Sequence, residues 1–256
     1  MRIKFLKIIK WATGVMLVAF FVYCAAFLRA GETHIIQSSV LGENRSISVY
    51  LPYGYETDGK QTYPVVYSLD GEKWRHGAII AANARFLSTM GFADAAIVIA
   101  VHTEGHRVRD YVPSNNATSF LQFLKVEIIP WVESRYRVNT HRALSGHSLG
   151  GLFTLYALAQ EPALFQAYFA YDPSILRDDN LLSKVAQVIE NGGADGTYLY
   201  VNFGFHTERY RQRMNDLWLI MQQNQTRLTH TRKTYYPLPH SLIMLPGQLE
   251  AMLNAR

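Results

Sequence analysis

Cysteine is almost absent from this chain of 256 residues, and the single one, Cys24, lies within the first 30 residues. A lone cysteine cannot form an intramolecular disulfide bond. Because residues 31–256 contain none, they also hold no thiolate metal site and no cysteine nucleophile. Chemistry that depends on sulfur is therefore excluded from this larger part of the chain, which we call the body.

The body also lacks net charge. The whole chain carries a formal charge of +5, with 25 basic and 20 acidic residues. Five of the basic residues and none of the acidic ones fall in residues 1–30, which leaves 20 of each in the body. A nucleic-acid partner is therefore not expected. Internal repeats, low-complexity tracts and linkers are also missing, so residues 31–256 are expected to form one catalytic domain.

Residues 1–30 have a basic start followed by an apolar run from Trp11 to Leu28. This layout is typical of a signal peptide or of a single membrane anchor. Cleavage after Ala26 would suit a signal peptide, whereas a run of about 18 apolar residues is long enough to span a bilayer. A buried core helix is the remaining alternative. The basic start predicts an extracytoplasmic body, periplasmic or secreted, which the segment could anchor to the inner membrane.

Apolar runs and helical spacing alternate along the body. The first two strands flank a turn-rich segment, residues 41–45, that suggests an opening hairpin. This alternation predicts an α/β fold: a mostly parallel, doubly wound sheet with an antiparallel start and helices on both faces. Strands are predicted over 33–40, 46–51, 63–69, 95–101, 143–144, 167–171, 197–203 and 231–236, and helices over 76–90, 117–133 with a kink at Pro130, 151–159, 181–189, 209–222 and 242–253.

The most informative stretch is Gly146-His-Ser-Leu-Gly150, a G-x-S-x-G arrangement between a short apolar strand and a helix-like run. In this context the serine sits on a strained strand-to-helix turn, and the glycines remove side chains that would clash there. Ser148 Oγ would then be exposed at the carboxyl edge of the sheet. The amide of Leu149 and the helix dipole would face an oxyanion beside it. The alternative is a glycine-rich turn whose serine only caps the helix.

A serine hydroxyl needs an adjacent base, normally a histidine oriented by an acid. His240 is suitably placed, in the loop after the last predicted strand. The acid is expected after the seventh strand, where Glu208 is the candidate. Asp172, after the preceding strand, is its competitor, and a Ser-His pair without an acid is also open.

Several other residues near the predicted sheet edge are also candidates for the site. Gly71 follows the third strand, where a second oxyanion donor is expected. His147 and His206 are expected to shape their turns rather than to transfer protons. Arg107, Arg109 and Arg177 could bind an anionic substrate, although exposed arginines usually form solvated surface.

Several further segments form an ordered series along the body: residues 41–45 with 49–52, 67–71, 109–113, 123–130 with 135–136, 146–151, 172–174 and 240. Taken together, these segments resemble the esterase family of the α/β-hydrolase superfamily, which includes S-formylglutathione hydrolases, feruloyl esterases and trilactone esterases of catecholate siderophores. The resemblance implies an α/β-hydrolase fold with Ser148 as nucleophile, His240 as base, and the amides of Gly71 and Leu149 as oxyanion donors. One departure is Leu176-Arg177, where relatives often have an aromatic pair.

The expected activity is therefore hydrolysis of a carboxylic ester through an acyl-enzyme, without a metal ion or cofactor. The expected partner is a small-molecule ester: a trilactone siderophore is the most specific candidate, beside small-acyl and aryl esters. Two alternatives use the same scaffold. An acyltransferase would pass the acyl group to an alcohol instead of water, and a membrane-tethered binding protein would have no turnover.

Overall fold

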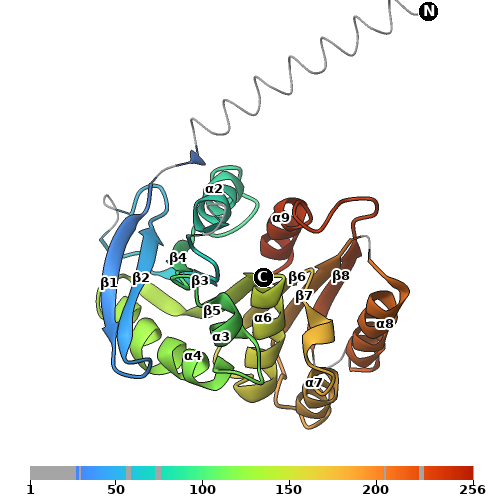
Figure 1. Cartoon of the computed structure of the whole chain (residues 1–256). Helices are drawn as coiled ribbons and strands as arrows, with labels where there is room; N and C mark the ends of the chain where they lie inside the picture. The colour runs from blue at the N-terminus through green and yellow to red at the C-terminus, as the bar shows by residue number, and fades with distance from the viewer. Residues whose placement is uncertain are drawn as a thin grey trace, which may run out of the picture.

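The structure is a computed structural model that describes residues 27–28, 30–55, 59–72, 76–204, 206–224 and 228–255 (Figure 1). Cys24, the cleavage site after Ala26 and most of the apolar run expected to be a signal peptide or anchor lie outside the described residues. Within the described part of the chain, every helix is too short or too polar to cross a membrane.

A single sheet of eight strands forms the centre of the body, in the order β1-β2-β4-β3-β5-β6-β7-β8. β2 pairs antiparallel with β1 and β4, whereas all the other pairs are parallel. The predicted mostly parallel sheet with an antiparallel start is therefore confirmed. The strands are β1 (Glu32–Ser38), β2 (Glu43–Tyr50), β3 (Tyr63–Ser68), β4 (Ile97–Val101), β5 (Val138–His147), β6 (Ala167–Tyr171), β7 (Tyr198–Phe203) and β8 (Thr229–Thr234).

Helices cover both faces of the sheet (Figure 1). One face is covered by α2 (His76–Thr89) and α9 (Met244–Asn254), which also contact each other. The short helices α3 (Arg107–Tyr111) and η3 (Ile175–Arg177) lie in connections at the carboxyl edge. The other face is covered by α4 (Ala117–Phe123), the π-helical segment η2 (Leu124–Ile128), α5 (Ile129–Glu133), α6 (Leu149–Gln160), α7 (Leu181–Glu190) and α8 (Glu208–Gln223).

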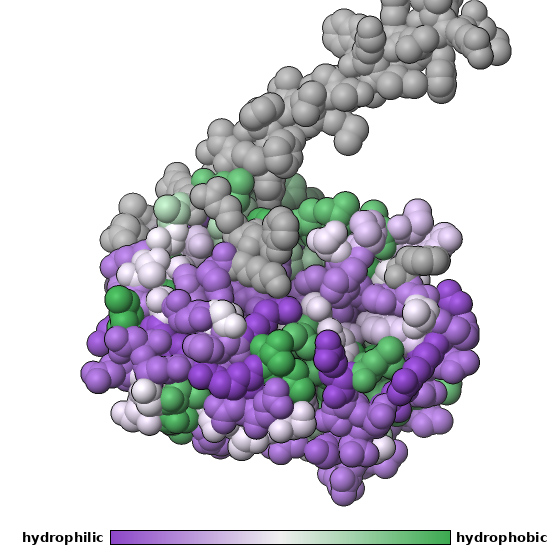
Figure 2. All heavy atoms as spheres, in the orientation of Figure 1, coloured by the Kyte–Doolittle hydropathy of each residue, from purple (hydrophilic) through white to green (hydrophobic). Residues whose placement is uncertain are grey.

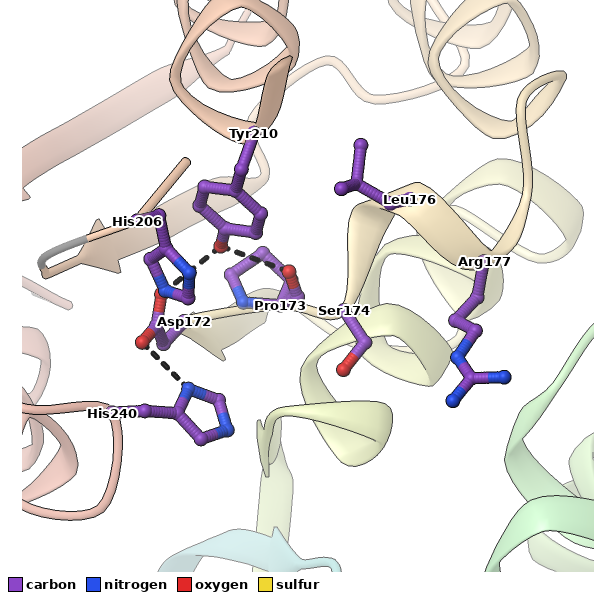
Figure 3. A pocket seen from close by; sticks show the side chains of 8 residues that line it. All are labelled: Asp172, Pro173, Ser174, Leu176, Arg177, His206, Tyr210 and His240. Atoms are coloured by element: carbon purple, nitrogen blue, oxygen red, sulfur yellow. Dashed lines mark hydrogen bonds and ion pairs between the residues drawn. The ribbon is translucent and has the colours of Figure 1, made fainter. Parts of the chain in front are cut away.

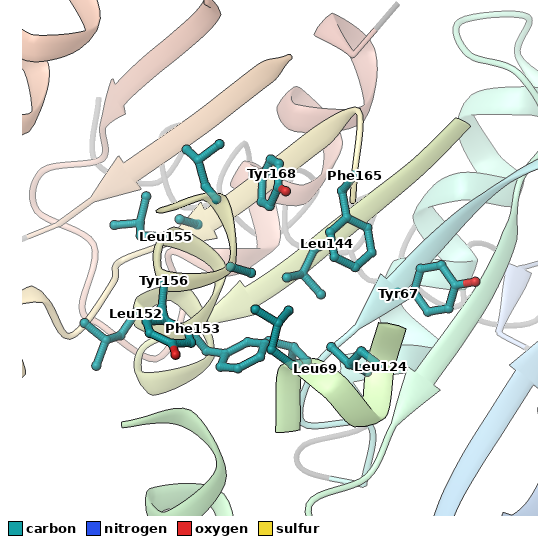
Figure 4. Close-up of a cluster of buried hydrophobic side chains, with 14 of the residues drawn as sticks. Tyr67, Leu69, Leu124, Leu144, Leu152, Phe153, Leu155, Tyr156, Phe165 and Tyr168 are labelled. Carbon is teal, nitrogen blue, oxygen red and sulfur yellow. The ribbon is translucent and has the colours of Figure 1, made fainter. Parts of the chain in front are cut away.

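Two apolar cores lie on the two faces of the sheet. In β4 the side chains of Ile97, Ile99 and Val101 enter the larger core, whereas Val98 and Ala100 enter the smaller one. A strand that is apolar throughout is therefore stable here, because each buried aliphatic side chain contributes about 1.5–3 kcal/mol. Figure 4 shows part of the larger core, with Leu144, Leu152, Phe153, Phe165 and Tyr168 among its members.

The clearest differences from the sequence-based expectation concern two segments. The predicted polar loop over residues 103–115 contains α3, because Tyr111 is buried against Phe120 and Phe153 at centroid distances of 5.4 and 5.5 Å. The helix predicted over residues 117–133 is continuous but becomes π-helical just before Pro130. Proline has no N–H to donate to the preceding turn, so the regular hydrogen-bond pattern is interrupted there.

The register of the parallel strands brings several strand ends to one edge. Ser68 on β3 pairs with Ser145 on β5, and His147 on β5 pairs with Tyr171 on β6, which in turn pairs with Asn202 on β7. The loops after β3, β5, β6 and β7 therefore begin side by side. Most of the candidate residues identified from the sequence are in or next to these loops.

Candidate active site

Ser148 occupies the sharp turn between β5 and α6. Its backbone angles are φ 61° and ψ −115°, a region that residues with a side chain rarely adopt. Because β5 ends at His147 and α6 begins at Leu149, the serine alone forms the turn. Its amide donates to the carbonyl oxygen of Tyr171 on β6 at 2.9 Å. The strand, turn and helix predicted around G-x-S-x-G are therefore all present.

Glycine is required at position 146 because β5 and α6 approach each other closely there. A Cβ atom on Gly146 would lie 2.3 Å from the carbonyl oxygen of Gly150 and 2.8 Å from the hydroxyl of Thr154. The backbone of α6 cannot yield as a flexible side chain would, so a larger residue would force the helix away from the strand. This glycine therefore permits the sharp turn that exposes Ser148.

His240 lies in the loop between β8 and α9, and its Nδ1 is 2.7 Å from Oδ2 of Asp172 (Figure 3). Asp172 directly follows β6 and is 1% exposed. Since an ionised carboxylate only accepts, Nδ1 carries the proton of this bond and Nε2 is left with the lone pair that a base needs. In Figure 3 the Nε2 atom points away from Asp172.

The second oxygen of Asp172 is also occupied. Oδ1 accepts hydrogen bonds from His206 Nε2 at 2.7 Å and from the hydroxyl of Tyr210 at 3.0 Å. Burial raises the pKa of Asp172, but the hydrogen bond from His240 and the charges of His206 and His240 outweigh it and hold the pKa below its usual value. The ligating atoms of Asp172, His206 and His240 lie within 4.8 Å of one another and could also hold a metal ion.

Glu208, the acid expected from the sequence, lies away from His240. It is the first residue of α8, its side chain is exposed, and its carboxylate binds Arg211 on the same helix. The reason is local: the side chain of Thr207 accepts from the amide of Tyr210 and caps the helix, which starts with Glu208 directed to solvent. The structure instead joins His240 to Asp172, the competing candidate.

The hydroxyl of Ser148 is hydrogen bonded to Oγ of Ser174 at 3.2 Å. The amide of Ser174 in turn donates to the carbonyl oxygen of Ser148 at 2.9 Å, so the two residues contact each other through both backbone and side chain. Among the described residues, no hydrogen bond joins Ser148 Oγ to His240. Such bonds commonly shorten only when substrate binds.

The two amides expected to bind an oxyanion differ in availability. Leu149 is the first residue of α6, and amides of the first turn have no acceptor within the helix. The amide of Gly71, by contrast, donates to the carbonyl oxygen of Val101 at 2.9 Å, so the expectation for Gly71 is wrong. Glycine is needed there for packing, since a Cβ atom would lie 2.7 Å from the ring of His102.

Two of the three candidate substrate-binding arginines are held in ion pairs. Arg107 donates from Nε to Asp70 at 2.6 Å and from Nη2 to the carbonyl oxygen of His147 at 2.8 Å, which secures the strand end before Ser148. Arg109 binds Glu43 and Asp110. These contacts indicate structural roles, and they leave Arg177 as the candidate that faces open space.

A pocket of about 330 Å³ opens beside the Asp172 and His240 pair. Leu176 and Arg177 line the pocket on the side away from Asp172 and His240 in Figure 3. Ser174, which contacts the hydroxyl of Ser148, also lines it. The pocket lined by His240 therefore reaches a residue that contacts the nucleophile candidate, although Ser148 itself is not part of its lining. Its lining consists of Asp172, Pro173, Ser174, Leu176, Arg177, His206, Tyr210 and His240.

His147 fixes the loop that carries His240. Its Nε2 donates to the carbonyl oxygen of His240 at 2.9 Å, and the two rings pack with centroids 4.5 Å apart. Burial, followed by repulsion from the charge of His240, lowers the pKa of His147 from 6.5 to about 3. His147 therefore stays neutral and acts as a donor to the loop, in agreement with the structural role expected for it.

This lowered pKa predicts a loss of stability in acid. Between pH 6.5 and about 3, the unfolded chain binds a proton at His147 that the folded protein does not. Stability from this group is therefore complete above pH 6.5 and falls as the pH drops, by at most about 1.4 kcal/mol per pH unit. Urea unfolding at several pH values should show a shallower decline for His147→Gln than for the unaltered protein. Equal slopes would contradict the assignment.

The strand order and the Ser148 turn at the carboxyl edge define an α/β-hydrolase fold, as the resemblance implied. Residues 38–237 match the sequence model of the family described as "Putative esterase", and the chain belongs to this family.

Individual relatives agree with this placement. The chain is 38% identical over 169 residues to ferri-bacillibactin esterase BesA of Bacillus subtilis, covering 56% of this chain and 58% of the relative. It is 32% identical over 154 residues to the siderophore triacetylfusarinine C esterase of Aspergillus fumigatus, covering 52% of each. The chain thus spans just over half the length of these curated relatives. An IroE-like serine hydrolase from Shewanella oneidensis superposes with a TM-score of 0.80 at 25% identity, over 87% of this chain and 79% of its own.

Proposed function

We propose that the protein is a serine esterase that hydrolyses a carboxylic ester through an acyl-enzyme. One observation carries the proposal: a serine on a strained turn lies at the same sheet edge as a histidine that is hydrogen bonded to a buried aspartate, and the serine hydroxyl contacts Ser174 in the wall of the pocket that this histidine lines. A binding protein would gain nothing from a nucleophile held in an unfavourable backbone conformation.

In the first half of the proposed reaction, Ser148 Oγ turns from Ser174 to Nε2 of His240. The oxygen attacks the ester carbonyl as its proton passes to Nε2, and the carbonyl oxygen becomes an oxyanion. Asp172 keeps Nδ1 of His240 protonated and stabilises the imidazolium that forms. The carbon-oxygen bond of the ester then breaks, and the leaving alkoxide takes the proton from Nε2.

In the second half, a water molecule gives its proton to His240 and attacks the acyl-enzyme. The Ser148 ester bond breaks, its oxygen recovers the proton from His240, and the carboxylic acid leaves. The oxyanion of both halves is bound by the amide of Leu149 and, we propose, by that of Glu72 in place of Gly71. The Glu72 carboxylate accepts from the amide and hydroxyl of Thr103, at 3.0 and 2.5 Å, and so holds this turn beside the site.

The proposed substrate is a small ester, with a siderophore-type ester as the specific candidate because related proteins are named as siderophore esterases. Arg177 at the pocket wall would attract an anionic group of such a molecule. Leu176 and Arg177 offer no aromatic surface at the positions where relatives often have one. The proposed pocket therefore suits recognition by charge better than stacking of a catechol ring on that wall.

The proposed location of the body is extracytoplasmic. The basic start and apolar run of residues 1–30 support export, with any membrane contact confined to this segment. Export would place the enzyme in the compartment that an imported or secreted ester reaches first.

The proposal is tested by treating the full-length protein with a fluorophosphonate and locating the modified residue by peptide mass spectrometry. We expect a single adduct on Ser148 that is prevented by an excess of hydrolysable ester. The same preparation is then assayed on p-nitrophenyl esters of increasing acyl length and on a ferric catecholate trilactone. A folded protein that is neither labelled nor active would contradict the proposal and favour the binding protein.

Product analysis distinguishes the proposed esterase from the acyltransferase alternative. With an acceptor alcohol present, an esterase releases mainly the free acid, whereas an acyltransferase forms mainly the new ester. We expect the free acid, because the pocket is open enough to admit water beside His240.

A further inference from the structure

The carboxylate of Asp172 is held by two histidines, only one of which has a role in the proposed reaction. We infer that the second, His206, is a positioning residue that fixes Asp172 in the orientation in which it binds His240. This inference rests on the proposed function, because it assigns His206 a role through Asp172. It also revises the expectation that His206 only shapes its turn.

The hydrogen bonds around Asp172 show why a second histidine matters. Oδ2 faces His240 Nδ1, and Oδ1 faces His206 Nε2, both at 2.7 Å. The remaining donor, the hydroxyl of Tyr210, is shared between Oδ1 at 3.0 Å and the carbonyl oxygen of Pro173 at 2.9 Å. Without His206, the shared hydroxyl of Tyr210 would be the one donor left on Oδ1 among the described residues, and it would oppose rotation of the carboxylate only weakly.

His206 is itself held firmly in place. Its ring stacks on that of Tyr210 with centroids 3.8 Å apart and an interplanar angle of 23°. The ring also meets that of His240 edge to face, with centroids 5.8 Å apart. Because Thr207, the next residue, caps α8, the backbone that carries His206 is fixed as well. Figure 3 shows the His206 and Tyr210 rings above Asp172, on the side opposite His240.

The burial of Asp172 makes the His206 hydrogen bond costly to lose. Asp172 is 1% exposed, so water cannot readily replace a missing donor. With only the shared Tyr210 hydroxyl on Oδ1, the carboxylate group can rotate, and the imidazole of His240 rotates with it. When a hydrogen bond to a buried charged group supports the transition state, its loss lowers the rate about 10- to 100-fold.

The experiment compares His206→Leu and His206→Gln in the full-length protein, with kcat and KM measured on a p-nitrophenyl ester. The glutamine amide can place a donor near the position of His206 Nε2, whereas leucine cannot. We expect kcat to fall about 10- to 100-fold in His206→Leu and less than about 5-fold in His206→Gln, with KM changed less than about 3-fold in both. His230→Leu, at a partly buried histidine beside Trp218, is the matched control and should leave both constants unchanged.

A second measurement reports on the hydrogen bond between His240 and Asp172. In the NMR spectrum of protein labelled with ¹⁵N at histidine, the Nδ1–H signal of His240 should persist in His206→Gln and broaden or shift upfield in His206→Leu. If the leucine variant does not fold, His206→Asn replaces it, because its shorter side chain cannot reach Asp172. Equal losses of kcat in the donor and non-donor variants, or a change confined to KM, would overturn the inference.

The outcomes separate this inference from the proposed function. If the unaltered protein neither hydrolyses esters nor labels at Ser148, the proposed function fails. If the unaltered protein is active and Asp172→Asn is not, while His206→Leu retains full kcat, only the role of His206 fails.

Discussion

Asp172→Asn is expected to lower kcat on ester substrates by about 10⁴-fold with little change in KM. Asparagine has nearly the same shape but no charge, so it cannot stabilise the His240 imidazolium that forms in each half of the reaction. Its amide can also present a donor to His240 Nδ1, which favours the tautomer with the proton on Nε2, the wrong nitrogen. Steady-state kinetics on a p-nitrophenyl ester measures the loss, and thermal unfolding checks that the variant is folded.

Glu208→Gln is the matched control for this prediction, because Glu208 is the acid that the sequence favoured. The exposed Glu208 carboxylate binds Arg211 at the start of α8, so its loss should change kcat less than about 2-fold and leave stability nearly unchanged. A large loss in Glu208→Gln together with an active Asp172→Asn would reverse the assignment of the acid.

Ser148→Ala is expected to lower kcat by about 10⁴- to 10⁶-fold, because the acyl-enzyme cannot form without the hydroxyl. Substrate binding should survive, since the pocket walls are contributed by other residues. The measurement is hydrolysis at high enzyme concentration, with binding of the intact ester followed separately. Fluorophosphonate labelling should disappear in the same variant.

Ser145→Ala provides the matched control for the loss of a serine hydroxyl. Ser145 lies on β5, three residues before Ser148, and is 1% exposed. Its replacement should leave kcat within about 3-fold of the unaltered protein. Retention of more than a hundredth of the activity in Ser148→Ala would contradict the role of this serine as nucleophile.

Much of the fold could be predicted because its signals are local. Alternating apolar runs and helical spacing located all eight strands, and β6 was bounded correctly at Ala167 and Tyr171. α3 was missed because five residues carry too little periodicity, and its helix depends on the burial of Tyr111 by distant residues. Periodicity also could not show that the helix ending at Glu133 becomes π-helical before Pro130.

The candidate site was predictable where the backbone dictates the geometry. The glycines around Ser148 mark a turn that few other sequences can form, and the loop after the last strand presents His240. The acid was harder, because Asp172 and Glu208 both follow strands at the same sheet edge. Which side chain turns inward depends on the helix cap at Thr207, a contact that no spacing rule reports.

The sequence by itself determined the fold class, the strained turn at Ser148 and the place of His240, because each follows from neighbouring residues acting on the backbone. Only the tertiary structure decided that Asp172 holds His240, that the Gly71 amide binds Val101, and that Arg107 supports the strand end before Ser148. These choices depend on which polar groups meet across the loops in a buried setting, where each donor and acceptor must find a partner. Distances between loops, rather than patterns within them, therefore decided the chemistry of the site.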